Sequence, residues 1–223
     1  MAVSDTALQR AQHYERSDPD VRLMLEVRDD NATAFEELVG RYQNRLVAVL
    51  NHLVRGRDMA EDLAQEVFMR VYRARKNYVP GAKFSTWLFT IANNVASNAL
   101  RSLSRRKEVN LEEPSGNKTG AMTLEQMAKA ASGLMPTRQL DKAEMGEIVR
   151  LAMESLNERQ RMALLLSKFE GMSYIDIAES MGLSTQAVKS LLSRARGSLR
   201  AILEPYMQQG DRPLEEGNGN GST

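Results

Sequence analysis

The sequence predicts an all-α protein made of two small helical domains joined by a flexible linker. Three observations lead to this fold class. Apolar residues recur at helical spacing in one segment after another, while alternating β-branched patterns are scarce. Alanine, leucine, methionine, arginine and glutamate, which favour helices, are frequent. Glycine, proline and serine gather between residues 108 and 139, which indicates a linker between the two domains.

Residues 1–20 are polar and lack a period, so we expect a mobile arm there. A short helix should then run from Val21 to about residue 28. Thr33 with Glu36 forms a capping box, which predicts that a long amphipathic helix begins there and ends before Gly56.

Two more helices complete the N-terminal domain. Asp58 with Glu61 gives the next capping signal, for a helix that reaches about residue 75. Pro80 and Gly81 then mark a turn, and the apolar residues from Phe84 to Leu103 follow a helical period. We expect the three long helices to share one core.

The C-terminal domain begins near residue 140 and ends in a predicted helix-turn-helix, from Ser173 to Arg200. Ser173 and Asp176 approximate a capping box for its first helix. Gly182 allows the left-handed backbone that ends this helix, and Ser184 can cap the next one.

The second helix of the pair predicts a DNA-binding face. Val188, Leu192, Ala195 and Leu199 follow the inner phase, and there is no acidic residue between Leu183 and Arg200. The residues that then face outward are Gln186, Lys189, Ser190, Ser193, Arg194 and Arg196. An ordinary helical hairpin with a solvated basic face is the alternative interpretation.

A second polar face lies on the helix that begins at Phe84. Its residues recur every three or four positions, and they are Thr90, Asn94, Asn98, Arg101 and Arg105. The segment from Arg75 to Lys107 contains basic residues and no acidic ones, so it attracts phosphate while its amides can bond to base edges. A solvated face with a basic tail is the alternative.

The composition excludes several classes of function. The net charge of +1 says little, but the absence of cysteine excludes disulfides, thiol catalysis and cysteine-ligated zinc. His13 and His52 do not form a metal-ligand pair at helical spacing. No segment approaches the roughly 20 apolar residues of a transmembrane helix, and the N-terminus lacks the pattern of a signal peptide. We expect a cytoplasmic protein that does not insert into the membrane, and no cofactor.

These patterns divide the chain into five segments. We expect a mobile N-terminal arm at 1–20, a first helical domain at 21–107, a flexible linker at 108–139, a second helical domain at 140–205 and a disordered tail at 206–223. Within the linker, at most one short helix is expected, around residues 124–129.

Four sequence matches in the same order resemble the extracytoplasmic-function (ECF) sigma factors of bacterial RNA polymerase. The matching segments are A-F-E-E-L-V-G-R-Y, A-E-D-L-A-Q-E-V-F-M-R-V-Y-R-A, F-S-T-W-L-F-T-I-A-N-N-V-A-S-N and Y-I-D-I-A-E-S-M-G-L-S-T-Q-A-V-K-S. They span about residues 34–107 and 141–203. The resemblance implies a transcription initiation factor that binds core polymerase, selects promoters and assists melting.

The resemblance also implies partners. These are the β′ clamp helices and the β flap of core RNA polymerase, promoter DNA, and an anti-sigma factor. The β′ contact would be carried by Asp62, Gln65, Glu66, Phe68, Met69 and Arg70. Asp62, Gln65, Glu66 and Met69 share one helix face, as docking in a groove requires. Read without the family, Asp62 and Glu66 are acids that complement the helix dipole.

Two promoter contacts follow from the same resemblance. The minus-ten element would be read by Tyr78, Lys83, Asn94, Asn98, Arg101 and Arg105, with Tyr78 as a base-stacking residue. Trp87 shares the helical phase of Leu88 and Ile91, so we expect it in the core. The minus-thirty-five element would be read by Gln186, Lys189, Ser190, Ser193, Arg194, Arg196 and Arg200. Leu191 stands where the family often has arginine, so the minus-thirty-five DNA sequence that this helix prefers stays open.

Two other functions remain open on sequence alone. A stand-alone helix-turn-helix regulator would bind DNA without joining polymerase. An enzyme acting on nucleic acid is disfavoured, because the chain has no Gly-rich phosphate loop and no Ser or Cys nucleophile motif.

Overall fold

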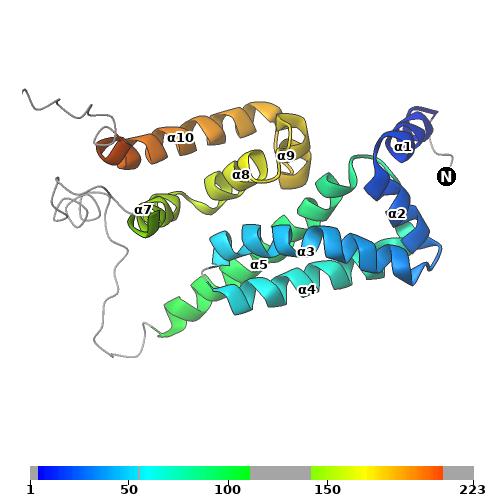
Figure 1. Cartoon of the computed structure of the whole chain (residues 1–223), viewed down its shortest axis with the longest axis horizontal. Helices are drawn as coiled ribbons and strands as arrows, with labels where there is room; N and C mark the ends of the chain where they lie inside the picture. The colour runs from blue at the N-terminus through cyan, green and yellow to red at the C-terminus, as the bar shows by residue number, and fades with distance from the viewer. Residues whose placement is uncertain (1–4, 55, 111–141, 208–223) are drawn as a thin grey trace, which may run out of the picture. The chain divides into compact units, whose positions relative to one another are not determined.

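The computed structural model describes residues 5–54, 56–110 and 142–207, and within them all regular structure is helical (Figure 1). The helices are α1 (Asp5–Ser17), α2 (Pro19–Arg28), α3 (Ala32–Val54), α4 (Arg57–Ala74), the short 3₁₀ helix η1 (Arg75–Asn77), α5 (Phe84–Asn110), α7 (Lys142–Glu154), α8 (Glu158–Lys168), α9 (Tyr174–Met181) and α10 (Thr185–Met207). The predicted all-α class is confirmed. The helix expected around residues 124–129, most of the linker and most of the tail lie outside the described residues.

The described residues form two compact units. The first contains α1 to α5 together with α8, α9 and the part of α10 up to Ser193. The second contains α7 and α10 from Arg194 onward. The sequence-predicted domains place α8 and α9 with the C-terminal half, so the first unit joins helices that are distant in sequence.

The core of the first unit is formed by α2, α3, α4 and α5, which pack against one another (Figure 1). Its largest fully buried side chains include Met24, Leu38, Leu46, Phe84 and Phe89. The rings of Tyr42 and Phe84 meet edge to face with their centroids 5.2 Å apart, which ties α3 to α5. The three long predicted helices therefore share one core, as expected.

The segment expected as a mobile arm, residues 1–20, contains helix α1 from Asp5 to Ser17, and the expected short helix is α2, which begins at Pro19 and not at Val21. Asp18 caps α2 by accepting the backbone N–H of Asp20 at 2.9 Å, and Pro19 occupies a first-turn position where its missing N–H costs nothing. Asp18 also accepts the backbone N–H of Phe84 at 3.0 Å. One carboxylate thus anchors the starts of α2 and α5.

Two predicted helix starts are displaced by a few residues. The carboxamide oxygen of Asn31, and not the hydroxyl of Thr33, caps α3 by accepting the N–H of Ala34 at 3.2 Å. Helix α4 begins at Arg57 after Gly56, one residue before the predicted cap Asp58. Helix α5 extends to Asn110, three residues past the predicted end of the first domain.

In the second unit, α7 buries Ile148, Ala152 and Met153, whereas Val149 and Leu151 are exposed. Arg150 forms ion pairs with Glu147 and Glu154 on the outer face of this helix.

Candidate nucleic-acid and partner interface

The helix-turn-helix forms as the sequence predicts. The hydroxyl of Ser173 accepts the N–H of Asp176 at 3.1 Å, and the Asp176 carboxylate accepts the N–H of Ser173 at 3.3 Å, which completes the capping box. Gly182 ends α9 with φ of 63° and ψ of 40°. Ser184 accepts the N–H of Ala187 at 3.2 Å and caps α10.

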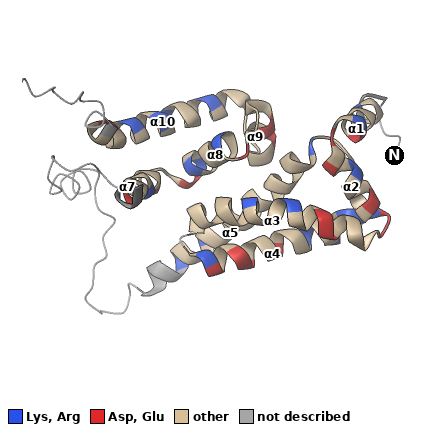
Figure 2. Cartoon of the chain, in the orientation of Figure 1, with Lys and Arg blue, Asp and Glu red and all other residues tan. Residues whose placement is uncertain are grey.

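The outer face of α10 is basic and open. Val188, Leu192 and Ala195 are fully buried, so the opposite side of the helix faces solvent. The predicted residues that are exposed are Gln186, Lys189, Ser193, Arg194, Arg196 and Arg200, while Ser190 is half-buried. Figure 2 shows the basic residues along α10. The guanidinium of Arg200 lies 3.6 Å from the Glu204 carboxylate, and this ion pair partly neutralises the charge of Arg200.

Leu191 is half-buried on this helix. Part of its surface is therefore available at the face predicted to meet DNA. A leucine there offers apolar contact and no charge, so it can pack against a thymine methyl group but cannot bind phosphate.

The polar stripe of α5 is present as predicted. Asn94, Asn98, Arg101 and Arg105 are all exposed, so two amides and two guanidinium groups lie along one side of the helix. Thr90 is half-buried because its hydroxyl donates to the backbone oxygen of Thr86 at 2.8 Å. Thr90 therefore supports the helix, and the accessible part of the stripe begins at Asn94.

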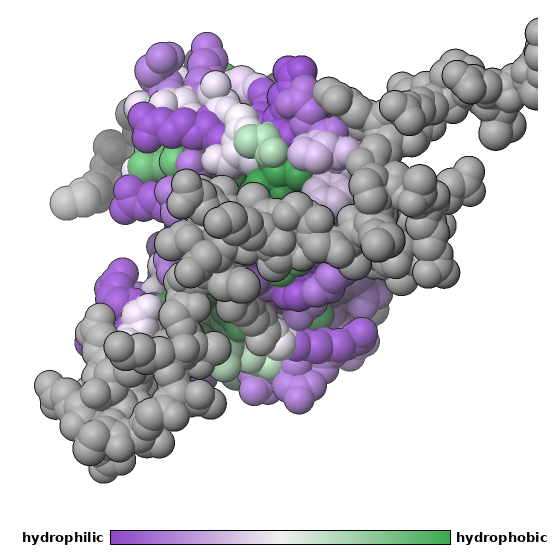
Figure 3. All heavy atoms as spheres, turned by 90° about the vertical axis from the view of Figure 1, so that its left-hand side faces the viewer, coloured by the Kyte–Doolittle hydropathy of each residue, from purple (hydrophilic) through white to green (hydrophobic). Residues whose placement is uncertain are grey.

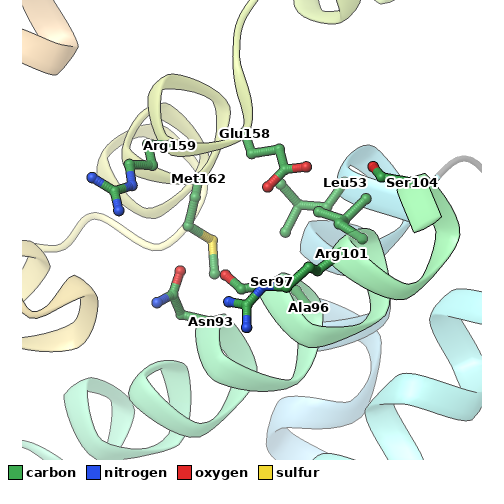
Figure 4. Close-up of a pocket in the computed structure, with 10 residues that line it drawn as sticks. Leu53, Asn93, Ala96, Ser97, Arg101, Ser104, Glu158, Arg159 and Met162 are labelled. Atoms are coloured by element: carbon green, nitrogen blue, oxygen red, sulfur yellow. The ribbon is translucent and has the colours of Figure 1, made fainter. Parts of the chain in front are cut away.

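A hollow of about 310 Å³ lies where α5 faces α8 in the first unit (Figure 4). Asn93, Ser97, Arg101 and Ser104 line it from α5, and the Met162 thioether of α8 points toward the Asn93 and Ser97 side of it. Polar and apolar groups line it in about equal measure, unlike the mainly apolar lining of most small-molecule sites. Arg101 borders this hollow and its side chain is exposed to solvent.

Tyr78 is placed differently from the expectation. Its side chain is only 4% exposed, and its ring packs on Trp87 with the centroids 4.8 Å apart. Burial raises the pKa of the Tyr78 phenol. The ring is thus not available for base stacking in this conformation, because Tyr78 turns inward from the loop that precedes α5. Trp87 is half-buried between Tyr78 and Phe84, which agrees with its predicted packing role.

The same loop presents a residue that the sequence analysis missed. Val79 is 65% exposed, next to the buried Tyr78 and Pro80. Its position before Pro80 disfavours helix and favours an extended backbone, and this signal could have identified it as a projecting residue. Lys83, at the end of the loop, forms an ion pair with Asp176 at 3.3 Å.

The α4 residues predicted to bind a partner divide into two sets. Asp62, Gln65, Met69 and Arg70 are exposed, and Met69 shows 46% of its surface. Glu66 is half-buried and accepts a hydrogen bond from Arg70 at 2.7 Å. This bond with Arg70 holds the pKa of Glu66 below its ordinary value.

Phe68 does not belong to the exposed set. It is 7% exposed, and its ring packs edge to face against Phe35 of α3 at 6.5 Å. Its helical phase points toward α3, so only a small part of the ring reaches the surface.

A groove of about 320 Å³ between α3 and α4 borders this surface. Gln65, Phe68 and Met69 line one side, and the other side is formed by residues that the sequence analysis did not assign to a partner surface. These are Val39, Gln43 and Val47, at spacings of four on α3. Residues four positions apart lie on one face of a helix, so the sequence could have indicated that these three side chains form one wall.

Other kinds of site are not found among the described residues. There, no cluster of three or more His, Cys, Asp or Glu residues is placed to hold a metal ion. In the same ranges, none of the helices combines the length and the apolar character needed to cross a membrane. Hydrophilic residues cover most of the described surface on the face shown in Figure 3, with small hydrophobic areas between them.

Comparison with known families identifies two matching segments. Residues 38–106 match the model of sigma-70 region 2, and residues 146–199 match the model of sigma-70 region 4. The first covers the C-terminal part of α3, α4 and most of α5, and the second covers the helix-turn-helix.

Curated relatives cover nearly the whole chain. The RNA polymerase sigma-H factor of Pseudomonas aeruginosa is 32% identical over 193 residues, which span 85% of this chain and 96% of that protein. The ECF RNA polymerase sigma-E factor of Haemophilus influenzae is 32% identical over 84% of this chain and 97% of its own length. The sigma-E factor of Escherichia coli K12 is 31% identical, with 84% and 95% covered.

Two solved structures share the fold. CnrH, in a complex with the cytosolic domain of CnrY, aligns with a TM-score of 0.61 at 23% identity, over 84% of this chain and 98% of its own. The sigma factor RpoE of Bartonella quintana, in a complex with the anti-sigma factor NepR, aligns with a TM-score of 0.56 at 26% identity, over 76% and 96%.

Proposed function

The chain belongs to the ECF sigma factors of RNA polymerase, and from that premise we propose that α4 binds the core enzyme while α5 and α10 read the two elements of a promoter. Its function is that of a transcription initiation sigma factor. We assign the chemistry of RNA synthesis to the polymerase and no catalytic step to this chain. Since its partners would be core polymerase and DNA, we place its action in the cytoplasm.

The observation that carries the proposal is the pair of separate polar faces on α5 and α10. Each face lacks acidic side chains between its basic ones, so each attracts phosphate. Two modest contacts on one chain raise the effective concentration of the second contact once the first has formed. A linker at 108–139 between domains at 21–107 and 140–205 would let both faces bind one promoter.

On α5, we assign minus-ten recognition to Asn94 and Asn98. Both amides are exposed one turn apart, and each has a donor and an acceptor that can pair with the edge of an unstacked base. Arg101 and Arg105 continue the same side and would follow the phosphate backbone. Lys83 would join them once it is released from Asp176.

On α10, we assign minus-thirty-five recognition to the first two turns. Gln186, Lys189 and Ser190 lie nearest the N-terminus of the helix, the end that enters the major groove in helix-turn-helix proteins. Ser193 and Arg194 extend this face, and Arg196 and Arg200 would contact phosphate.

The core-binding surface combines the exposed Asp62 and the half-buried Glu66 of α4 with the groove between α3 and α4. Asp62 and Glu66 provide negative charge, while Met69 and Gln65 border the hollow. A helix lying in such a groove buries apolar area at Met69 and meets charge at its rim. We propose that the β′ clamp helices bind here and that the β flap contacts the C-terminal domain.

An anti-sigma factor is a further proposed partner. The support is the RpoE relative, which is described in a complex with the anti-sigma factor NepR. A stand-alone regulator is not favoured, since the relatives that cover 84–85% of this chain are polymerase sigma factors.

The core-binding proposal is tested by gel filtration of the full chain with core polymerase. Asp62→Lys/Glu66→Lys should weaken core affinity at least roughly tenfold, or about 1.4 kcal/mol, because it reverses the charge of the docking rim. Glu147→Lys is the matched control, because Glu147 is also an exposed helical acid paired with an arginine. Equal elution of wild type and double variant with the polymerase would refute the assignment to α4.

A further inference from the structure

The hollow between α5 and α8 in the first unit is lined by residues of which the proposed function uses only Arg101. Its volume is about 310 Å³, and Figure 4 shows the side chains around it. Ligand pockets usually measure about 300–1,000 Å³, so this hollow has room for a small molecule of nucleotide size. The mixed polar and apolar lining suits a ligand that has one charged end and one flat, apolar end.

Two arginines border the hollow from different helices. Arg101 of α5 and Arg159 of α8 are both exposed. Among the described residues neither guanidinium forms an ion pair, whereas Arg45, Arg70 and Arg150 each bind a carboxylate. A guanidinium presents several N–H donors in a planar fork that matches the oxygens of phosphate. Two such groups lining one hollow therefore favour an anion with the geometry of phosphate.

Neutral hydrogen-bonding groups lie beside the guanidinium of Arg101. In Figure 4 the Arg101 side chain turns back along α5 toward Ser97, and the Asn93 amide lies on the same side of the hollow. These three residues are spaced four positions apart, so they share one face of α5. Arginine, serine and asparagine side chains are common donors to phosphate oxygens. This side of the hollow thus combines a positive charge with two neutral donors.

The other side of the hollow suits a sugar and a base. Leu53 of α3 and Leu100 of α5 provide an apolar wall, and Leu53 is only 4% exposed. Glu158 and Ser104 lie on the Leu53 side in Figure 4. A carboxylate accepts hydrogen bonds from ribose hydroxyls, as the acidic residue of many dinucleotide sites does. Because Glu158 repels an anion, the phosphate is expected at Arg101 and the ribose at Glu158.

We propose that this hollow binds a ribonucleotide, whose phosphate contacts Arg101 and Arg159 and whose ribose contacts Glu158. The base packs against the wall formed by Leu53 and Leu100. This inference goes beyond the proposed function, which assigns Arg101 to the promoter backbone and gives the hollow no ligand. A bound nucleotide would occupy Arg101, so it would compete with DNA for that side chain.

Isothermal titration calorimetry on the full chain, without polymerase or DNA, tests the site. The probes are the diphosphates ADP, GDP, CDP and UDP, the 2′-deoxy form of the tightest binder, its nucleoside, and inorganic phosphate. The nucleoside and inorganic phosphate should each bind at least about tenfold more weakly than the diphosphate, because each makes only part of the contacts. The deoxy form should bind at least about fivefold more weakly, since it lacks one hydrogen bond to a charged group.

Two substitutions separate the phosphate contact from the ribose contact. Arg159→Ala should weaken diphosphate binding roughly tenfold or more, because charge-assisted hydrogen bonds are lost. Glu158→Ala should remove the preference for the ribose form over the deoxy form. Both side chains are exposed, so neither change should disturb the fold. Arg73→Ala, which removes an exposed arginine of α4 outside the hollow, is the matched control and should leave the affinity unchanged.

Failure of all four diphosphates to bind at about 1 mM would overturn the proposal. An unchanged affinity in Arg159→Ala, or an equal loss in Arg73→Ala, would do the same. Inorganic phosphate that binds as tightly as the best diphosphate would overturn the nucleotide assignment, and a ribose preference that survives Glu158→Ala would overturn the position of the sugar. These measurements use neither polymerase nor promoter, so their failure is distinct from a failure of the proposed function.

Discussion

Tyr42 and Tyr78 form a matched pair for a stability measurement. Each is 4% exposed, but only one hydroxyl is satisfied. Tyr42 donates to the Asp20 carboxylate at 2.5 Å, whereas the Tyr78 hydroxyl is buried without a hydrogen-bond partner among the described residues. The same substitution, tyrosine to phenylalanine, should therefore change stability in opposite directions at the two positions.

The magnitudes follow from what each hydroxyl loses or regains. An unsatisfied buried polar group costs about 1–3 kcal/mol, so Tyr78→Phe should stabilise the protein by about 1 kcal/mol while keeping the ring on Trp87. Tyr42→Phe removes a hydrogen bond to a charged group and should destabilise it by about 1.5–3 kcal/mol. Tyr78→Ala also leaves a cavity and should cost about 3–5 kcal/mol.

Urea unfolding followed by far-ultraviolet circular dichroism measures these differences. Trp87 is the single tryptophan, and its fluorescence reports on the first unit in the Tyr42 variant. Equal m-values would show that only stability changed. If Tyr78→Phe destabilised the chain as much as Tyr42→Phe, the Tyr78 hydroxyl would have a partner and the reasoning would be refuted.

Three other predictions use single sites. Asn94→Ala should weaken open-complex formation by about 1–3 kcal/mol without loss of core binding, and equal losses in both assays would contradict its base-reading role. Lys189→Ala should reduce the salt slope of promoter binding by about 0.9, whereas an unchanged slope would remove Lys189 from phosphate. Burial and the Arg161 charge lower the pKa of His52, so the folded state resists its protonation. Stability should be level above pH 6.5 and fall as the pH drops through that value, a loss that His52→Gln should diminish in urea titrations.

Helix identity and the turn before α10 were predictable because local chemistry determines them. Ser173, Asp176, Gly182 and Ser184 act within a few residues of their own positions, and each takes its predicted place. The periodicity of α10 likewise places Val188 and Leu192 inside. Local signals of this kind survive whatever the rest of the chain does.

Other features depended on contacts between distant segments. Thr33 was the predicted cap of α3, whereas Asn31 takes this place and also donates to Glu26 of α2. Tyr78 carries a polar group and sits in a loop, so its sequence indicates exposure, yet Trp87 covers its ring. Helix α1 was missed because its residues are polar and show no apolar period, whereas α2 was expected from Val21 and begins only two residues earlier, at Pro19.

The contact between α9 and the first turn of α5 was the least predictable feature. Ser180 and Asp176 are polar residues on a short helix, and their partners lie 94 and 90 positions away. No periodicity links such residues. Only the fold shows that their sides of α9 and α5 meet.

Asp176 takes part in two structures at once. Its carboxylate completes the cap of α9 through Ser173, and it also receives Lys83 and lies against Thr86. Burial acts to raise its pKa, but Ser173 and Lys83 outweigh that effect and keep the carboxylate ionised. A protein engineer who adapts this helix-turn-helix for a synthetic gene circuit should therefore leave Asp176 intact. A substitution there would uncap α9 and would also leave Lys83 and Thr86 without this acceptor.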